Sequence, residues 1–489
     1  MAAPGAAPAL TTPSTSSFIK DVFMSPFWER LGANANSLAV LDTSSNVEYT
    51  YASLQAAVDR AREYLAPFDR GLVLLVAGRD IGAITLYLAA LQAGHAVFLS
   101  PAPPQWEACA RLIETFQPEL VFLPDHALSE RLRPSYDLLG HMSGYELMAR
   151  QQCEHRPLHP ELALVLSTSA STGSSKVARF SRKNLAASAT QVATALELGA
   201  RERLLACLPF SFVYGLSALN GALESGASIV LVPGTPADRE YWIKVAASRV
   251  TMLPAVTQIV DYLRALRIDS DSLPTVSKFT HSGDALDAAM FEWLYGHYAA
   301  RGVRLYLMYG QTEACGRMTV LHPRHLPDLR RSVGTPVGTS TISTGVEGEV
   351  VFRGPAVMMG YAHSRDDLTL GDELNGALRT GDSGHLDESG FLFLNGRLSR
   401  YCKIFGQRLS LDEIERDLRA DGTVAAIELD GRLVLIAEGT TSALTVQAVA
   451  RMYRIPPQCI RIAVVDRLPR TAHGKIAYAR LHDITAATT

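Results

Sequence analysis

The chain has 489 residues, which is too long for one ordinary hydrophobic core and therefore predicts two or more domains. Its composition, 47% hydrophobic, 8% aromatic and 19% charged, is that of a globular protein and excludes a disordered one. The 46 Lys and Arg nearly balance the 49 Asp and Glu, and a formal net charge of −3 gives no general attraction to nucleic acid or to an anionic membrane. An anionic ligand must therefore be held by a local site.

The cysteines and the start of the chain indicate the compartment. The six cysteines are scattered without metal-like or CxxC spacing, and most lie in apolar runs, which predicts buried free thiols in a reducing environment. Residues 1–17 have no basic segment or continuous apolar core, and we interpret them as a disordered leader rather than a signal peptide. No stretch approaches 18 uninterrupted apolar residues, so no membrane span is expected. These features favour a cytoplasmic protein.

Short apolar runs alternate with amphipathic stretches through the first three quarters of the chain. The expected strands include GLVLLVAG (71–78), HAVFLSP (95–101), RLLACLPF (203–210), RVTMLPAV (249–256), SKFTHSG (277–283) and VRLYLMYG (303–310). Helical patterns separate them, and Ser181 is a good N-cap for one of these helices. Nearly continuous apolar strands joined by helices predict parallel sheets covered by helices, an α/β fold. In such sheets ligands gather beyond the carboxyl ends of the strands.

The sequence pattern changes near residue 332, where short β-type segments interrupted by glycines predict a small barrel-like subdomain. Beyond Arg397 the pattern becomes a hairpin (424–439), a helix (442–454) and a strand (459–466), which predicts a small α+β domain. We therefore divide the chain into a leader (1–17), an N-terminal core (18–396) and a C-terminal domain (397–489).

The stretch STSASTGSSKVARF (167–180) follows the apolar run LALVL and resembles a phosphate-binding loop in composition. Its hydroxyls and backbone amides could surround phosphates while Lys176 supplies positive charge. It is not a Walker A loop, because the first glycine is missing, Val177 follows the lysine, and no helix begins there. A surface loop without a ligand remains the alternative from this stretch alone. The candidate phosphate-binding residues are Thr168, Ser169, Ser171, Thr172, Gly173 and Lys176.

Four further motifs follow in order: MYGQTEA (308–314), RTGDSGHLDESGFLFLNGR (379–397), KIFGQRLSLDEIE (403–415) and LPRTAHGKI (468–476). Together with the Ser/Thr-rich loop, they resemble the adenylate-forming (ANL) superfamily of acyl-CoA synthetases, nonribosomal adenylation domains and luciferases. The resemblance covers roughly residues 20 to 480. It implies a large N-terminal adenylation domain, a small mobile C-terminal lid domain, and ATP and Mg²⁺ as cofactors.

The resemblance implies a role for residues of each motif. Thr312 would contact the α-phosphate, Glu313 would bind Mg²⁺, and Lys475 would be the catalytic lysine. The ribose hydroxyls would be bound by Asp382 and Arg397. The candidates for contacts with adenine and the rest of the nucleotide are Gly283, Asp284, Ala285, Tyr309, Gly310 and Gln311. Tyr309 could stack on the base, although core packing is the better explanation for that tyrosine taken alone.

The acyl pocket is the least readable part of the sequence. The candidates in LPFSFVYGL (208–216) are Phe212, Tyr214 and Gly215, and Phe212 stands where many acyl-CoA and aryl-CoA ligases have histidine. The stretch is apolar and has no acid to pair with a substrate ammonium group, which favours a fatty or aromatic acid over an amino acid. Each of these residues could equally belong to the core.

Several positions depart from the family pattern. Ala170, Ser175 and Val177 take places where the phosphate loop usually has glycine, proline and glycine. The hinge of the C-terminal domain is expected at Ser399, where relatives commonly have Asp or Lys. The lid-to-ribose stretch and the C-terminal domain also look shorter than usual. The identity of the thiol acceptor, CoA or a carrier protein, therefore stays open.

We therefore expect an ATP-dependent ligase that activates an apolar carboxylic acid as acyl-AMP. It would pass the acyl group to CoA or to the phosphopantetheine of an acyl or peptidyl carrier protein. Three alternatives remain open: a stand-alone amino-acid adenylation enzyme, a non-catalytic nucleotide-binding homologue, and a luciferase-type oxygenase.

Overall fold

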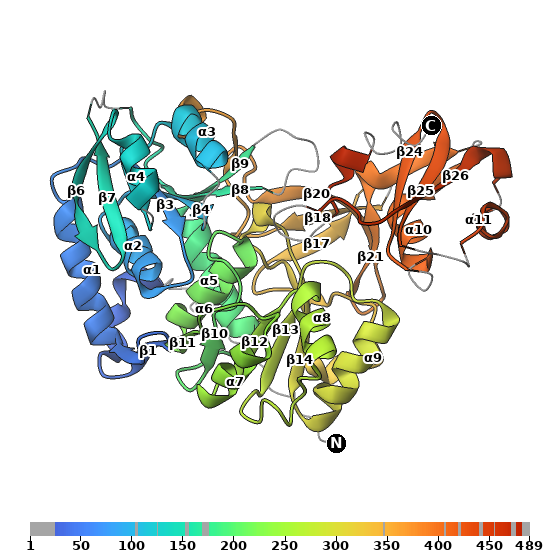
Figure 1. Cartoon of the computed structure of the whole chain (residues 1–489), viewed down its shortest axis with the longest axis horizontal. Helices are drawn as coiled ribbons and strands as arrows, with labels where there is room; N and C mark the ends of the chain where they lie inside the picture. The colour runs from blue at the N-terminus through green and yellow to red at the C-terminus, as the bar shows by residue number, and fades with distance from the viewer. Residues whose placement is uncertain are drawn as a thin grey trace, which may run out of the picture.

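A computed structural model describes residues 25–102, 106–124, 126–151, 156–168, 176–345, 348–404, 407–418, 422–439, 444–453, 455–470 and 476–481. The expected leader, residues 1–17, lies outside them. Figure 1 shows a large body built on two mixed sheets and a smaller lobe formed by the C-terminal residues. None of the helices in the described ranges is long and apolar enough to cross a membrane.

The first large sheet has eight strands, and its central pairs are parallel. In spatial order they are β19 (Gly360–Ala362), β9 (Val177–Ser181), β8 (Leu162–Ser167), β4 (Ala96–Pro101), β3 (Leu72–Ala77), β5 (Leu120–Leu123), β7 (Tyr145–Arg150) and β6 (Tyr136–Met142). Every residue of β3 is buried, with Val73 and Leu75 in one apolar cluster and Leu72 and Leu74 in another. Burial on both faces explains why the sequence of this strand is a continuous apolar run.

The second large sheet has nine strands, of which β1 and β10 to β14 form parallel pairs. In spatial order they are β16 (Thr335–Pro336), β15 (Thr319–Leu321), β14 (Arg304–Tyr309), β13 (Lys278–His281), β12 (Met252–Ala255), β10 (Arg203–Leu205), β11 (Ser228–Leu231), β1 (Leu38–Asp42) and β2 (Val47–Thr50). The sheet confirms the predicted parallel arrangement.

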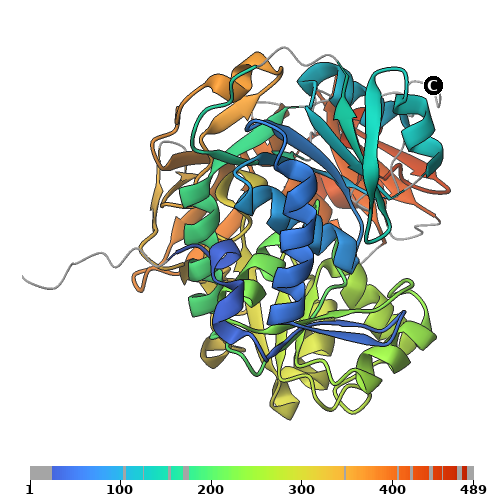
Figure 2. The ribbon, with the colours of Figure 1, turned by 90° about the vertical axis from the view of Figure 1, so that its left-hand side faces the viewer.

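Helices cover both sheets and fill the space between them. They are α1 (Tyr51–Leu65), α2 (Ile81–Gln92), α3 (Trp106–Phe116), α4 (His126–Leu132), α5 (Arg182–Ala195), α6 (Val213–Glu224), α7 (Arg239–Ala247), α8 (Thr257–Leu266) and α9 (Ala288–His297). Buried residues of α2 and α6 join strands of both sheets in one apolar cluster. Figure 2 faces α1, which begins directly after β2 and runs toward the eight-stranded sheet. The Ser181 N-cap of α5 is confirmed, since Ser181 and Asn184 form a capping box.

The Gly-punctuated segment forms a smaller antiparallel sheet of β17 (Thr341–Thr344), β18 (Glu349–Arg353), β20 (Ala377–Leu386) and β21 (Leu392–Arg397). The C-terminal residues form the expected α+β arrangement. Its elements are β22 (Tyr401–Ile404), β23 (Gln407–Ser410), α10 (Leu411–Asp417), β24 (Val424–Leu429), β25 (Arg432–Glu438), α11 (Val446–Tyr453) and β26 (Ile460–Val465). They have an apolar core of their own, which includes Ile404, Ile414 and Leu435.

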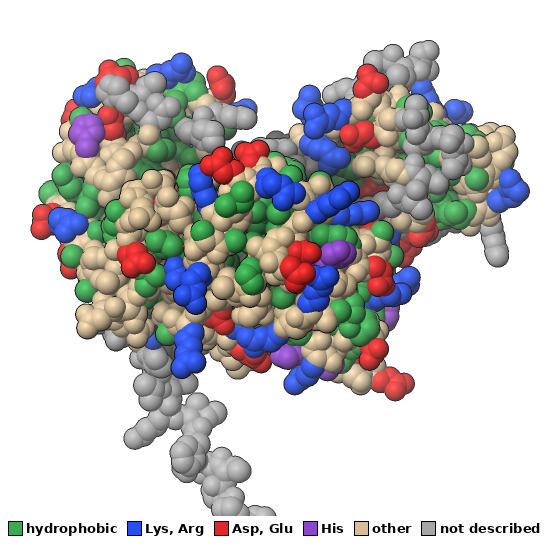
Figure 3. Space-filling model, turned by 60° about the horizontal axis from the view of Figure 1, so that its bottom comes forward, with side chains coloured by type: hydrophobic (Ala, Val, Ile, Leu, Met, Phe, Trp, Pro, Cys, Tyr) green, Lys and Arg blue, Asp and Glu red, His purple; other side chains and the backbone are tan. Residues whose placement is uncertain are grey.

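Charged side chains of both signs mingle on the face shown in Figure 3, in keeping with the balanced net charge. The cysteines within the described ranges are free thiols, and four of the five, Cys109, Cys207, Cys315 and Cys402, are buried. This confirms the prediction of buried free thiols for these four cysteines. Cys153 lies outside the described residues.

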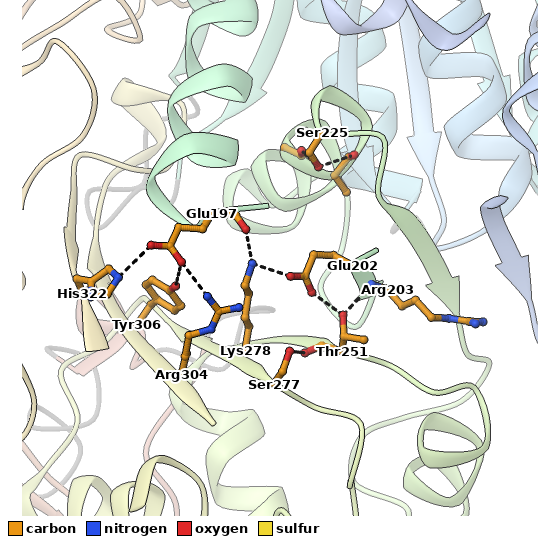
Figure 4. A network of polar contacts seen from close by, with 12 residues as sticks. Glu197, Glu202, Arg203, Ser225, Thr251, Ser277, Lys278, Arg304, Tyr306 and His322 are labelled. Atoms are coloured by element: carbon orange, nitrogen blue, oxygen red, sulfur yellow. Dashed lines mark hydrogen bonds and ion pairs between the residues drawn. The ribbon is translucent and has the colours of Figure 1, made fainter. Parts of the chain in front are cut away.

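The two ends of the nine-stranded sheet differ in chemistry. At the amino ends of β13 and β14, Lys278 and Arg304 join a network of polar contacts that includes Glu197 and Glu202 (Figure 4). The side chain of Lys278 has no exposed surface, and its Nζ lies 2.6 Å from Oε1 of Glu202. The carboxyl ends of the same strands carry His281 and Tyr309, which begin the candidate site.

Candidate active site

The structure places three of the predicted nucleotide-binding residues around the buried carboxylate of a fourth, Asp382. Asp382 lies in β20 and is 7% exposed. Its Oδ2 accepts hydrogen bonds from the hydroxyl of Tyr309 and from Nε2 of Gln311, both at 2.5 Å. Nε of Arg397, in the neighbouring strand β21, lies 3.3 Å from Oδ1. Residues from two different sheets therefore meet at this carboxylate.

Burial raises the pKa of Asp382, while Arg397, Tyr309 and Gln311 act against that rise. The carboxylate raises the pKa of Tyr309 further above its usual value, which burial has already raised, so the phenol remains a hydrogen-bond donor. A carboxylate has about four lone-pair positions, so Asp382 keeps capacity for the hydroxyls of a ribose. The ring of Tyr309 belongs to the core beneath the small sheet, and its predicted stacking on a base stays a prediction.

A second cluster connects the predicted metal ligand to the predicted phosphate loop. Glu313 lies in the short helix η4 (Thr312–Ala314), which also contains Thr312. The hydroxyl of Tyr361 donates a hydrogen bond of 2.8 Å to Oε1 of Glu313. Nζ of Lys176 lies 3.9 Å from the centroid of the same tyrosine ring, a cation–π arrangement. Tyr361 therefore joins the lysine of the loop to the carboxylate.

Strand pairing explains how Tyr361 arrives there. It lies in the edge strand β19, which pairs antiparallel with β9, so that Tyr361 is opposite Ala178. The buried side chain of Arg179 fixes β19 in place, because its Nε donates to the Tyr361 carbonyl at 3.1 Å and its Nη2 lies 2.5 Å from Glu373. Tyr361 was not predicted from the sequence, since this pairing joins segments that are far apart in the chain.

The ends of the Ser/Thr-rich loop are close together. The backbone nitrogen of Thr168 and its Oγ1 both donate to the carbonyl of Lys176, at 3.4 and 3.0 Å. The remaining candidates of this loop, Ser169, Ser171, Thr172 and Gly173, and the departures at Ala170 and Ser175 lie outside the described residues. Their phosphate-binding role stays a prediction.

The predicted adenine strip, Gly283, Asp284 and Ala285, is exposed and follows the carboxyl end of β13. Gly283 has a φ of +115°, which L-residues rarely adopt, so glycine is required by the backbone here. Oγ1 of Thr257 donates to the Asp284 carbonyl at 3.2 Å. The adjacent His281 is buried, and burial lowers its pKa to about 4. An exposed strip beside a neutral imidazole could accept a flat base.

Two glycines, one in the nucleotide motif and one in the acyl segment, are packed so closely that a side chain would not fit. A Cβ at Gly310 would lie 2.1 Å from the carbonyl oxygen of Gly316. A Cβ at Gly215 would lie 2.3 Å from the carbonyl oxygen of Pro209. Gly215 therefore serves close packing of α6 against the preceding loop, whereas Phe212 is partly exposed at the start of this helix.

Tyr214 is buried, and its hydroxyl donates a 2.8 Å hydrogen bond to the carbonyl of Thr280, next to His281. The guanidinium carbon of Arg317 lies 4.3 Å from the centroid of the Tyr214 ring. Arg317 is a second residue that the sequence analysis did not identify. A single charged residue within the otherwise uncharged stretch ACGRMTVL, directly after the nucleotide motif, was the available signal.

The predicted hinge residue Ser399 lies in the short helix η8 (Leu398–Arg400), between β21 and β22. Asp412 of α10 connects both sides of it, because its carboxylate accepts from the backbone nitrogen of Arg397 and from Nε of Arg400, at 2.8 and 2.7 Å. Arg400 also lies 2.5 Å from Glu415, whose other oxygen accepts from Tyr478 at 2.7 Å. Lys475 itself lies outside the described residues, and its role and the domain boundary near Arg397 stay predictions.

The residues present fit ATP and magnesium. Within the described ranges, no group of three or more His, Cys, Asp and Glu is placed to hold a metal ion. Glu313 and the phosphates of a bound nucleotide would together hold a magnesium ion, which is the usual way that proteins bind Mg²⁺–nucleotide complexes. Asp382 and Arg397 would hold the sugar, and Lys176 would face the phosphates.

Comparisons with known proteins identify the family of the chain. Residues 27–362 match the model of a family described as AMP-binding enzyme. The chain is 28% identical to indoleacetate–CoA ligase of Aromatoleum aromaticum over 384 residues, 71% of this chain and 72% of that protein. It is 27% identical to 2-succinylbenzoate–CoA ligase of Bacillus velezensis over 467 residues, 89% of this chain and 92% of that protein.

Solved structures show the same fold. O-succinylbenzoate coenzyme A synthetase of Bacillus subtilis, in complex with ATP and magnesium ion, superposes with a TM-score of 0.74 at 22% identity, covering 94% of this chain and 99% of that chain. ATP-bound MatB of Rhodopseudomonas palustris gives a TM-score of 0.77 at 20% identity, covering 94% and 98%. Since the family model spans residues 27–362, more than half of the chain, the protein belongs to the AMP-binding enzyme family and is an AMP-forming acid–thiol ligase.

Proposed function

We propose that this ligase activates an apolar aromatic or fatty carboxylic acid as acyl-AMP and transfers the acyl group to the thiol of CoA. The observation that carries the proposal is the meeting of Asp382, Tyr309, Gln311 and Arg397 beside the Glu313–Tyr361–Lys176 cluster. The first group offers acceptors and donors to a ribose, and the second offers charge to phosphates. The two relatives, indoleacetate–CoA ligase and 2-succinylbenzoate–CoA ligase, are both named for aromatic acids and CoA, which supports the substrate class and the acceptor.

In the first step, an oxygen of the substrate carboxylate attacks the α-phosphorus of ATP, and the bond to the pyrophosphate oxygen breaks. Magnesium, when bound, would neutralise phosphate charge. Asp382 and Arg397 orient the nucleotide, Thr312 donates its hydroxyl to the α-phosphate, and Lys475 places positive charge where it is needed during attack. In the second step, a thiolate attacks the acyl carbonyl carbon, the thioester forms, and AMP leaves.

The polar contacts around Ser399 support a hinge between the two steps. Asp412 joins the segment before the hinge to the segment after it, through Arg397 and Arg400. Tyr478, three residues beyond Lys475, is tied through Glu415 to the same arginine. Rotation about Ser399 would break the contact between Asp412 and the Arg397 backbone, while Asp412, Arg400, Glu415 and Tyr478 move together. It would exchange Lys475 for the segment around 403–408. The free thiols of the described cysteines support a reducing compartment, and we place the enzyme in the cytoplasm.

The test is product analysis with the purified protein, ATP, Mg²⁺, CoA and a series of aryl and fatty acids. We expect equal amounts of AMP and acyl-CoA by chromatography, and no ADP. Acyl transfer to a holo carrier protein but not to CoA would show that the proposed acceptor is wrong, while the proposed adenylation step would stand. Activation of amino acids alone, or ATP binding without any product, would overturn the proposal.

A further inference from the structure

Arg317 is a buried cation that the reaction described above does not use. Its side chain is among the largest that are fully enclosed, with 2% of the residue exposed. It follows the nucleotide motif closely, four residues after Glu313. Burial lowers the pKa of the guanidinium to about 10, which still leaves it charged at neutral pH. A buried charge without a partner is strongly unfavourable.

Only one nitrogen of the guanidinium is satisfied among the described residues. Nη1 donates to Oγ of Ser217 and lies 3.5 Å from the Tyr214 carbonyl oxygen. Nε and Nη2 are buried and have no hydrogen-bond partner within the described part of the chain. The nearest charge-compensating feature there is the face of the Tyr214 ring, 4.3 Å from the guanidinium carbon.

The two unsatisfied nitrogens identify the missing partner by geometry. Nε and Nη2 lie on one edge of the planar guanidinium, and their N–H bonds are parallel. A carboxylate accepts from this edge with both oxygens at once, and it also compensates the positive charge. A neutral oxygen would satisfy at most one of the two donors well and would leave the charge uncompensated.

The position of Arg317 connects this edge to the acyl site. Gly316 packs against α6, since a Cβ there would lie 3.1 Å from both Oγ of Ser217 and the carbonyl oxygen of Val213. Arg317 is thereby held over Tyr214, whose hydroxyl reaches Thr280 at the end of β13. The guanidinium therefore lies between the nucleotide motif and the helix that carries the predicted substrate residues.

We propose that Arg317 determines substrate specificity by binding a second carboxylate of the acid, at the end remote from the carboxyl group that reacts. The inference rests on the proposed function and narrows its substrate class to acids with an apolar body and two carboxylates. The reacting carboxylate is not the partner, because bidentate pairing would occupy both oxygens and weaken the one that must attack phosphorus. Ser217 is a positioning residue, since it holds Nη1.

The test compares acids that differ only in the second carboxylate. The pairs are octanoate with octanedioate, 4-oxo-4-phenylbutanoate with 2-succinylbenzoate, and 3-phenylpropanoate with its 2-, 3- and 4-carboxy derivatives. Acyl-hydroxamate formation with ATP, Mg²⁺ and hydroxylamine gives kcat/KM for each acid. We expect the wild-type enzyme to prefer at least one diacid over its matched monoacid by about 100-fold.

Three variants locate the preference. Arg317→Met should lower kcat/KM for that diacid by about 100-fold and change it for the monoacid by less than about 3-fold. Arg317→Lys keeps the charge but not the two-donor edge. Its kcat/KM for the diacid should therefore lie between the values for the wild type and for Arg317→Met. Arg330, an exposed arginine paired with Glu292, supplies the matched control Arg330→Met, which should leave both values unchanged.

The outcomes separate the inference from the proposed function. If the wild-type enzyme activates monoacids and rejects every matched diacid, the inference is wrong and the proposed function stands. Equal losses for monoacid and diacid in a folded Arg317→Met would also overturn it, since the arginine would then serve the reacting carboxyl or the fold. If that variant does not fold, the wild-type preference within each pair still decides. Hydroxamate from none of these acids would overturn both proposals.

Discussion

The hydroxyl of Tyr361 lies 2.8 Å from Oε1 of Glu313, while the face of the same ring lies 3.9 Å from Nζ of Lys176. One side chain on the edge strand β19 thus contacts the predicted metal ligand and the lysine of the predicted phosphate loop. Burial and the negative charge of Glu313 raise the pKa of Tyr361, so the phenol stays protonated and remains a donor. This arrangement holds the Glu313 carboxylate in one orientation before the nucleotide arrives.

Replacing Tyr361 by Phe removes the hydrogen bond to Glu313 and keeps the ring beneath Lys176. A hydrogen bond to a charged group contributes about 1.5 to 3 kcal/mol, so we expect kcat/KM for ATP to fall by roughly 10-fold or more, with a higher Mg²⁺ requirement. Pyrophosphate release measured over a magnesium titration checks this. A magnesium titration identical to that of the wild type would remove Tyr361 from the site.

Lys475→Ala should abolish adenylation and leave ATP binding largely intact, because the lysine acts on charge that develops during attack. Loss of one such contact costs on the order of 10²–10³ in rate. Tyr478→Phe, which loses the hydrogen bond to Glu415, should lower kcat with little change in KM for ATP. Pyrophosphate release and nucleotide binding by calorimetry measure the two effects. Near-normal pyrophosphate release by Lys475→Ala would contradict the assignment.

The stability of the large domain should depend on pH through His281. Burial lowers the pKa of this imidazole to about 4 in the folded chain, from an ordinary value of 6.5. Between these values the unfolded chain binds a proton that the folded chain does not, so the free energy of unfolding rises with pH. The contribution is complete above about pH 6.5, and roughly 3 kcal/mol is lost on approach to pH 4.

Urea unfolding of the wild type and of His281→Gln at pH 7.0 and 4.5 isolates this contribution. The pH dependence should be smaller in the variant, because glutamine does not titrate. An equal pH dependence in both proteins would show that other groups are responsible.

Lys278 offers a stability test at the opposite end of the same sheet. Its side chain has no exposed surface and pairs with Glu202 at 2.6 Å. Lys278→Met leaves that carboxylate without its buried partner, and we expect a loss of about 3 to 5 kcal/mol in the free energy of unfolding. The double variant Lys278→Met with Glu202→Gln should recover part of it. At temperatures where the Lys278→Met variant is folded, its kcat should equal that of the wild type. A folded variant with impaired adenylation would contradict the placement of Lys278 outside the active site.

Much of the fold could be predicted from local patterns. Strand β3 is buried on both faces and therefore has a continuous apolar sequence, and the capping residues of α5 lie within four positions of each other. The hairpin β24–β25 and strand β26 were predicted for the same reason, since their signals are contained in short segments. Arg397 and Asp382 were found through their motif, and the structure places them side by side.

The rest depends on contacts that no local pattern contains. Tyr361 reaches Glu313 only because β19 pairs with β9, and a three-residue strand has too little sequence to predict its partner. Arg317 is the single charge in an apolar stretch, but that pattern shows neither its burial nor its contact with Tyr214 of α6. Gly215 stays a predicted acyl-pocket residue, and its close approach to Pro209, which leaves no room for a Cβ, is a contact that no local pattern contains.

The most direct test of the account is acyl-hydroxamate and pyrophosphate formation from ATP, Mg²⁺ and hydroxylamine across fatty, aryl and amino acids, with Lys475→Ala as the control. We expect equal amounts of the two products with an aryl or fatty acid, and neither product from the Lys475→Ala variant. Wild-type protein that binds ATP but releases no pyrophosphate with any acid would contradict the central claim that this site forms acyl adenylates.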